Sequence, residues 1–124
     1  QQSNLLTWRD DELYGPGWHV PGGVVRFKET LSSRVDKVLK QEIAASAVKI
    51  EGPIGFHEIF NDQRDKRGHF ICFVYKVTLI EDPPIETRAQ DGAITDGSWR
   101  WFTNCPDNLI KNQRPLVEYI NAKI

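Results

Sequence analysis

The sequence contains no methionine and only two cysteines, Cys72 and Cys105. The two cysteines lie far apart and lack the paired spacing of a zinc site or a redox motif. We therefore expect two free thiols in a reducing compartment, and a cytoplasmic protein. Because even an initiator methionine is absent, we expect the natural chain to begin upstream of Gln1 and an opening strand to precede it.

Neither sign of charge is in excess, since 16 basic residues stand against 17 acidic ones and the net charge is −1. Such a balance gives no overall attraction to nucleic acid or to an anionic membrane, so neither is expected as a partner. No apolar run approaches the roughly 20 residues of a membrane-spanning helix, and the N-terminus lacks the build of a signal peptide. The length of 124 residues predicts one domain over 1–124 with one hydrophobic core.

Apolar residues recur at the periods of both strands and helices. Strands are predicted at 4–8, 24–27, 48–50, 54–60, 69–80 and 98–103, with polar loops at 61–68 and 81–97. The most regular helix is predicted between Glu29 and Ala47, and a final helix from Pro115. The apolar side of that final helix consists of Leu116, Val117, Ile120 and Ile124. This mixture of elements predicts an α/β sandwich, in which helices flank a sheet.

One acidic residue interrupts the apolar side of the first helix. This side consists of Leu31, Val35, Val38, Leu39 and Ile43. At about 100° per residue, Glu42 projects near the centre of this apolar stripe. An unpaired carboxylate buried there would cost at least several kcal/mol, so it should be protonated, pair with an arginine, lie at the exposed end of the stripe, or bind a metal. The residues alone leave these alternatives open.

A glycine turn at Pro21-Gly22-Gly23 precedes this helix. Glycine lets a backbone approach a ligand closely, so a carbonyl of this turn could face the carboxylate of Glu42. One carbonyl, one carboxylate and several waters suit Mg²⁺, which often takes few protein ligands. A magnesium site is therefore a candidate at this place.

The region from about residue 23 to 44 resembles the Nudix box. That pattern is a glycine, five residues, a glutamate, seven residues, and then Arg-Glu-aliphatic-any-Glu-Glu-any-Gly. Four residues match it, namely Gly23, Glu29, Leu39 and Glu42. Four others depart from it: Lys37 stands for the arginine, Val38 and Gln41 for two metal-binding glutamates, and Ala44 for the closing glycine.

The losses at Val38 and Gln41 are typical of the GDP-mannose mannosyl hydrolase branch of the Nudix superfamily. Other features of that branch follow in order between Leu5 and Phe102, among them the Trp99-Arg100-Trp101 strand. The resemblance implies a Nudix-type α/β/α sandwich with a mixed sheet. It also implies Mg²⁺-dependent hydrolysis of a nucleotide-sugar, and many relatives in the family form homodimers.

Carried over residue by residue, the resemblance implies that the Gly22 carbonyl and the Glu42 carboxylate bind Mg²⁺. Arg9 would contact the diphosphate of the substrate, and Lys37 would hold Glu29 in place and border the substrate site. Each basic residue has a plainer alternative, a solvated charge at a strand end for Arg9 and an ordinary surface lysine for Lys37. Phe70 stands where the family has a tyrosine entering the long strand, which makes it a candidate substrate contact.

The general base is the most serious departure from the family. Its histidine base and a neighbouring glutamine ligand lie before the Trp99 strand, where this chain has Asp96 and Thr95. Asp96 is therefore the candidate base, with Asp91 in reserve because loop alignments slip. A carboxylate is a weaker base than histidine at neutral pH, and positioned bases contribute roughly 10² to 10⁴ in rate, so turnover should be slow.

Three functions remain open at this point. In the first, water attacks the anomeric carbon of the sugar and releases free sugar and a nucleoside diphosphate. In the second, a pyrophosphatase attacks phosphorus and releases a nucleoside monophosphate and a sugar phosphate. The third is a nucleotide-sugar binding module without catalysis, which the residues Val24, Val38 and Gln41 and the missing histidine favour.

Overall fold

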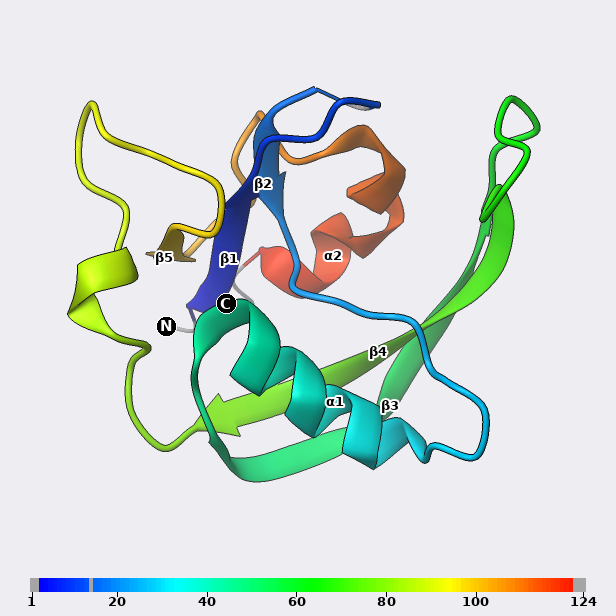
Figure 1. The fold of residues 1–124 in the computed structure, drawn as a ribbon, viewed down its shortest axis with the longest axis horizontal. Coiled ribbons are helices and arrows are strands. Elements are labelled where there is room, and N and C mark those ends of the chain that lie inside the picture. Colours follow the sequence, from blue (N-terminus) through cyan, green and yellow to red (C-terminus); the bar gives the residue numbers. More distant parts are fainter. Residues whose placement is uncertain (1–2, 14, 122–124) are drawn as a thin grey trace.

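The structure is a computed structural model that describes residues 3–13 and 15–121. Figure 1 shows strands β1, β2 and β5 on one side of the molecule and the long hairpin of β3 and β4 on the other. The strands are β1 (Asn4–Arg9), β2 (Gly17–His19), β3 (Ala47–Phe60), β4 (His69–Leu79) and β5 (Trp99–Phe102). The helices are α1 (Leu31–Val38), the π-helix η1 (Leu39–Ile43), the 3₁₀ helices η2 (Ile85–Thr87) and η3 (Lys111–Leu116), and α2 (Val117–Ile120).

The strands form two separate antiparallel sheets. The first has the order β2-β1-β5 and the second is the pair β3-β4. The predicted α/β class is therefore confirmed, but the single mixed sheet is not found in the part of the chain that the structure describes. Parallel contacts occur there as isolated bridges, for example between Trp18 and Leu109.

Two apolar clusters lie on either side of β1, because successive side chains of a strand point to opposite faces. Leu6 of β1 joins the cluster of Trp18, Ala89, Leu109 and Ile120. Leu5 packs against the other cluster, which consists of Leu39, Ile43 and Ala45 and also touches Val77 and Leu79 of β4. The helical segments η1 and α2 thus connect the two sheets, and β1 is the central strand of the molecule.

The first helix begins where its sequence predicts. The Thr30 hydroxyl caps it by accepting a hydrogen bond of 3.1 Å from the Ser33 amide. After Val38 the hydrogen bonding changes from α-helical to π-helical, and the segment ends at Ala44 in the left-handed conformation with φ 51°. The predicted position of Glu42 inside the apolar stripe is therefore wrong, because the 100° spacing no longer holds in a π-helix and Glu42 is exposed.

The other elements follow the sequence with local differences. The strands predicted at 48–50 and 54–60 are one strand, β3, with a register shift between Glu51 and Gly55. Residues 24–27 form no strand, and Pro115 lies inside η3 rather than in the first turn of a helix. Leu116 and Ile120 are buried as predicted, whereas Ile124 lies outside the described residues. Within 3–13 and 15–121, no helix combines the length and the apolar composition that crossing a membrane requires.

Candidate functional site

A buried histidine, His19 of β2, lies at the centre of the candidate site. The pairing of β2 with β1 places it opposite Thr7, and only 8% of its surface is exposed. Its Nδ1 atom lies 3.0 Å from the Thr7 carbonyl oxygen and 3.0 Å from the Thr7 hydroxyl. Because a carbonyl only accepts hydrogen bonds, Nδ1 carries the proton of the ring and donates a hydrogen bond to the Thr7 carbonyl. The lone pair of the neutral ring is therefore on Nε2, where it can accept a proton or bind a metal.

The charges of three predicted site residues act on this ring. Burial lowers the pKa of His19 below its usual value of 6.5, and the hydrogen bond with the Thr7 carbonyl partly offsets this. The charge of Arg9 lowers the pKa of His19 further, whereas the carboxylates of Glu42 and Asp96 raise it. The structure thus brings Arg9, Glu42 and Asp96 within electrostatic range of one imidazole that is held neutral.

Asp96 is hydrogen-bonded to the residue that follows β1. Its Oδ1 atom accepts a hydrogen bond of 2.9 Å from the Asp10 amide, and the Gly97 amide donates one of 2.8 Å to the Trp8 carbonyl. Asp91, the reserve candidate, is instead fully exposed and 3.8 Å from a guanidinium nitrogen of Arg100. The loop therefore places Asp96, and not Asp91, at the end of β1, where its charge acts on His19.

Arg9 is the last residue of β1 and directly precedes Asp10, whose amide binds Asp96. Its Nε atom lies 3.1 Å from a carboxylate oxygen of Asp11, and 55% of its side chain is exposed. The ion pair orients the guanidinium while leaving much of it accessible to an anionic ligand. A diphosphate is the class of ligand that such a fork of donors binds well.

The glycine turn packs against the helix that carries Glu42. A Cβ atom added at Gly23 would lie 3.0 Å from a methyl group of Val38, one helical turn before Glu42. In residues 3–13 and 15–121 no group of three or more His, Cys, Asp or Glu side chains has the arrangement of a metal site. The Gly22 carbonyl and the Glu42 carboxylate therefore stay predicted ligands of Mg²⁺.

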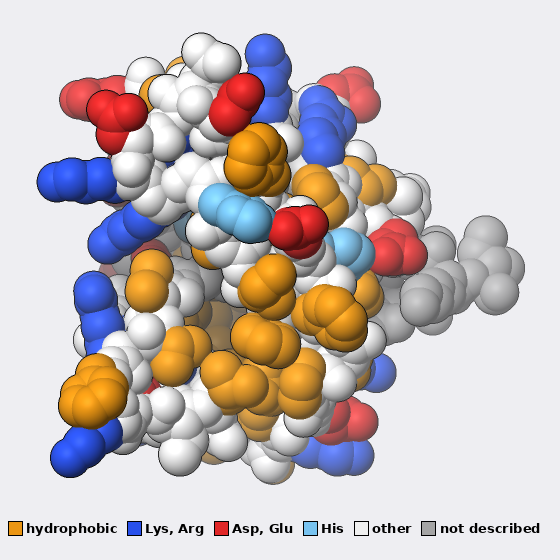
Figure 2. Space-filling model, turned by 90° about the vertical axis from the view of Figure 1, so that its right-hand side faces the viewer, with side chains coloured by type: hydrophobic (Ala, Val, Ile, Leu, Met, Phe, Trp, Pro, Cys, Tyr) orange, Lys and Arg blue, Asp and Glu red, His pale blue; other side chains and the backbone are white. Residues whose placement is uncertain are grey.

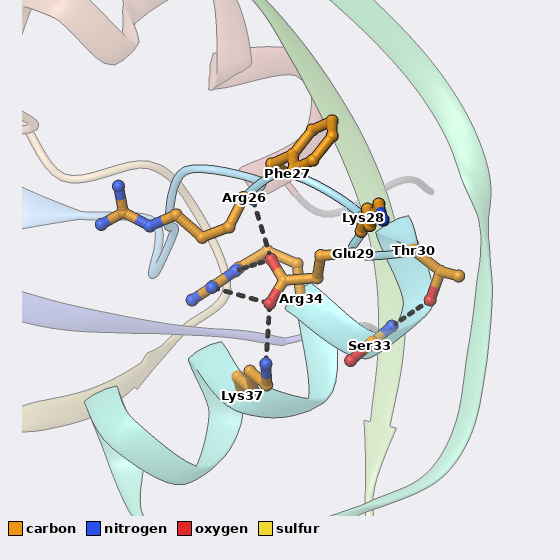
Figure 3. Close-up of a pocket in the computed structure, with 8 residues that line it drawn as sticks. All are labelled: Arg26, Phe27, Lys28, Glu29, Thr30, Ser33, Arg34 and Lys37. Carbon is orange, nitrogen blue, oxygen red and sulfur yellow. Dashed lines mark hydrogen bonds and ion pairs between the residues drawn. The ribbon is translucent and has the colours of Figure 1, made fainter.

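Figure 3 shows how Glu29 holds the start of α1. Its carboxylate accepts hydrogen bonds from Arg34 at 2.7 and 2.9 Å, from Lys37 at 2.8 Å and from the Arg26 amide at 3.0 Å. The hydrogen bonds from Arg34 and Lys37, followed by that from the Arg26 amide, lower the pKa of Glu29 to about 2. The predicted contact of Lys37 with Glu29 is therefore present, and Arg34 is a second partner that the sequence reasoning missed.

Lys37 and Phe70 are both predicted to contact the substrate, and the structure places them in different surroundings. Lys37 lines an open pocket of about 420 Å³ together with Arg26, Lys28 and Arg34, so it stays a candidate for an anionic ligand. Phe70 pairs with Ile59 beside the hairpin loop, and Figure 1 shows that this end of the hairpin lies apart from β1 and β2. The structure therefore does not bring Phe70 to the residues around His19.

His19 is the residue that sequence reasoning missed. The available signal was an ionisable side chain between Trp18 and Val20, in a short apolar segment before the glycine turn. Its contact with Thr7 depends on the pairing of β1 with β2, which no local spacing reveals.

Comparison with known proteins gives one informative relative. No protein-family model and no solved structure matches the chain. It is 35% identical over 82 residues to the low-salt glycan biosynthesis protein Agl8 of Haloferax volcanii. The match covers 63% of this chain and 52% of the relative, so the chain spans about half the length of the protein that it matches.

These comparisons correct the resemblance to the Nudix hydrolases. The relative is named for glycan biosynthesis, and no family model matches the region that resembles the box. Three of the four matching residues have structural roles that explain them: Gly23 packs against Val38, Glu29 binds two cations, and Leu39 is buried. The assignment to the Nudix superfamily and its mannosyl hydrolase branch is therefore wrong.

Proposed function

We propose that this chain forms the site of an Mg²⁺-dependent hydrolase that releases a free sugar and a nucleoside diphosphate from a nucleotide-sugar. The observation that carries the proposal is that Asp96 is bound next to Arg9 at the end of β1, and that the charges of both, with that of Glu42, act on the buried, neutral His19. A cation, two carboxylates and a neutral imidazole provide, in one place, the groups that diphosphate binding and proton transfer require.

In the proposed reaction, a water oxygen forms a bond to the anomeric carbon of the sugar. The bond from that carbon to the diphosphate oxygen breaks, and its electron pair leaves with the nucleoside diphosphate. Arg9 binds the diphosphate through its exposed guanidinium and stabilises the growing charge. Mg²⁺, when bound by the Glu42 carboxylate and the Gly22 carbonyl, supplies further positive charge at the leaving group.

Asp96 is the proposed base that takes the proton of the attacking water. Its carboxylate is exposed, and its hydrogen bond to the Asp10 amide fixes its position beside β1. Because Nδ1 of His19 is bound to Thr7, Nε2 offers a second proton acceptor. Two carboxylates suffice for one metal ligand and one base, whereas attack on phosphorus by two metal ions uses a larger ligand set.

The name of the matched relative supports the choice of substrate class. That protein is named for the biosynthesis of a glycan, and glycans are assembled from sugars activated as nucleoside diphosphates. A hydrolase of these activated sugars would act on the donors of such an assembly. The activity of the whole protein is part of this proposal.

A panel of nucleotide-sugars incubated with the protein and Mg²⁺ tests the proposal, with the products separated by chromatography. We expect free sugar and a nucleoside diphosphate. Nucleoside monophosphate and sugar phosphate would point to a pyrophosphatase instead. Stabilisation by a nucleotide-sugar without turnover would point to a binding module.

Glu42→Gln tests the metal ligand in the same assay. We expect it to raise the Mg²⁺ concentration needed for half-maximal turnover by at least tenfold, because the amide lacks the carboxylate charge. Glu86→Gln is the matched control, since Glu86 is an exposed glutamate of η2 outside the site. Equal Mg²⁺ dependence of the two variants would remove Glu42 from the metal site.

A further inference from the structure

The β3–β4 hairpin exposes a continuous apolar face. We define the outer face as the side of the hairpin that carries Ile54, Phe56, Glu58 and Phe60 of β3 and His69, Ile71 and Phe73 of β4. Its five apolar side chains are between 46% and 70% exposed, and Phe56 lies directly opposite Phe73. Figure 2 shows apolar side chains gathered on this side of the molecule, with a histidine and acidic side chains among them. Apolar patches of this kind mark interaction sites in soluble proteins.

The opposite face of the hairpin is covered in part by the protein itself. A Cβ added at Gly55 would clash with the hydroxyl of Tyr119, and His57 Nε2 lies 3.0 Å from that hydroxyl. Tyr119 belongs to α2, so α2 packs directly on this stretch of the hairpin. The layer that the protein itself supplies therefore lies on this side of the hairpin, whereas two strands alone are marginally stable in water.

We propose that the outer face is the interface of a symmetric homodimer, in which the outer face of a second copy supplies the missing layer. The polar groups of the face fit this occupant. Its two polar side chains are complementary, an imidazole and a carboxylate, with His69 Nε2 2.5 Å from a carboxylate oxygen of Glu58. Around a twofold axis each Glu58 can also meet the His69 of the other copy, because a twofold contact pairs one surface with itself. A nucleic acid or an anionic membrane would instead require an excess of basic groups.

The area of the outer face also fits the interface of a homodimer. At the observed exposures, five such side chains offer on the order of 500 Å² of apolar surface. A standard interface buries about 800 Å² on each partner, and about 65% of a homodimer interface is apolar. The outer face therefore supplies the apolar centre of one standard interface, and the neighbouring polar residues of the two strands supply its rim.

Sedimentation velocity over a concentration series tests the dimer. We expect the wild-type protein to sediment as a dimer that dissociates on dilution, and Phe56→Asp to sediment as a monomer at every concentration. Phe27→Asp is the matched control, because Phe27 is 91% exposed but lies in the loop before α1. This control should remain a dimer, and circular dichroism should show the same fold in all three proteins.

A milder pair of variants keeps the test informative if Phe56→Asp does not fold. Glu58→Lys removes the carboxylate that binds His69, at a side chain that is 64% exposed, so the monomer should tolerate it. We expect it to weaken dimerisation at least tenfold, and Glu58→Lys with His69→Glu to restore it. A wild-type monomer throughout the series would overturn the proposal, as would a dimer that none of these variants weakens. Binding of the wild-type monomer to lipid vesicles would assign the outer face to a membrane instead.

Discussion

At the scale of single residues, Thr7 determines the chemistry of His19. Its carbonyl accepts the Nδ1 proton and its hydroxyl lies equally close, so the ring is fixed in one tautomer. Burial then keeps the ring neutral by lowering its pKa. A neutral imidazole that exposes the lone pair of Nε2 to the charge of two carboxylates can act as a proton acceptor.

The lowered pKa of His19 predicts a dependence of stability on pH. The unfolded chain binds a proton at about the usual pKa of 6.5, whereas the folded chain binds it only at a lower pH. Between these two values the unfolded state holds more protons. The stabilisation is therefore complete above pH 6.5 and is lost as the pH falls toward the folded pKa. Denaturant unfolding at a series of pH values measures this slope.

One variant isolates the contribution of His19 to that slope. His19→Gln should flatten it, because glutamine does not titrate. In the wild-type protein, nuclear magnetic resonance should show the His19 ring titrating below 6.5. A slope that His19→Gln leaves unchanged, or a ring that titrates above 6.5, would contradict the assignment.

At the scale of elements, local patterns predicted most strands and the start of α1. The strand at 69–80 was recognisable because its apolar run is long, and Thr30 supplies a cap that needs no distant partner. The exposure of Glu42 could not be predicted, since the change to a π-helix after Val38 alters the angle between residues. Contacts between elements, such as that of Thr7 with His19, depend on strand pairing and cannot be predicted from the spacing of residues along the sequence.

The end of η1 gives a prediction for stability. Ala44 is left-handed, with φ 51°, although a side chain at Cβ disfavours that conformation by about 1 kcal/mol. Ala44→Gly should therefore stabilise the protein by about 1 kcal/mol or slightly less, because glycine also gains freedom in the unfolded chain. Denaturant unfolding measures the change, and Ala93→Gly is a control at an exposed alanine without positive φ. A loss of stability in Ala44→Gly would show that the turn is not left-handed.

At the scale of the whole molecule, β1 links the core, the candidate site and both sheets. Its alternating side chains enter both apolar clusters, its middle holds His19, and its end carries Arg9 and binds the Asp96 loop. The sequence predicted the candidate residues Arg9, Glu42 and Asp96, but their convergence arises only when β2 and the loop before β5 pack around β1. The outer face of the hairpin lies on a different side, so its dimerisation can be tested separately from catalysis.

The most direct test of the central claim is hydrolysis of a nucleotide-sugar in isotope-labelled water, with mass spectrometry of both products. We expect the heavy oxygen in the released sugar, since water attacks the anomeric carbon, and Asp96→Asn should slow its release by roughly 10² or more. Heavy oxygen in a phosphate product would contradict the account, and so would the absence of turnover with every substrate of the panel.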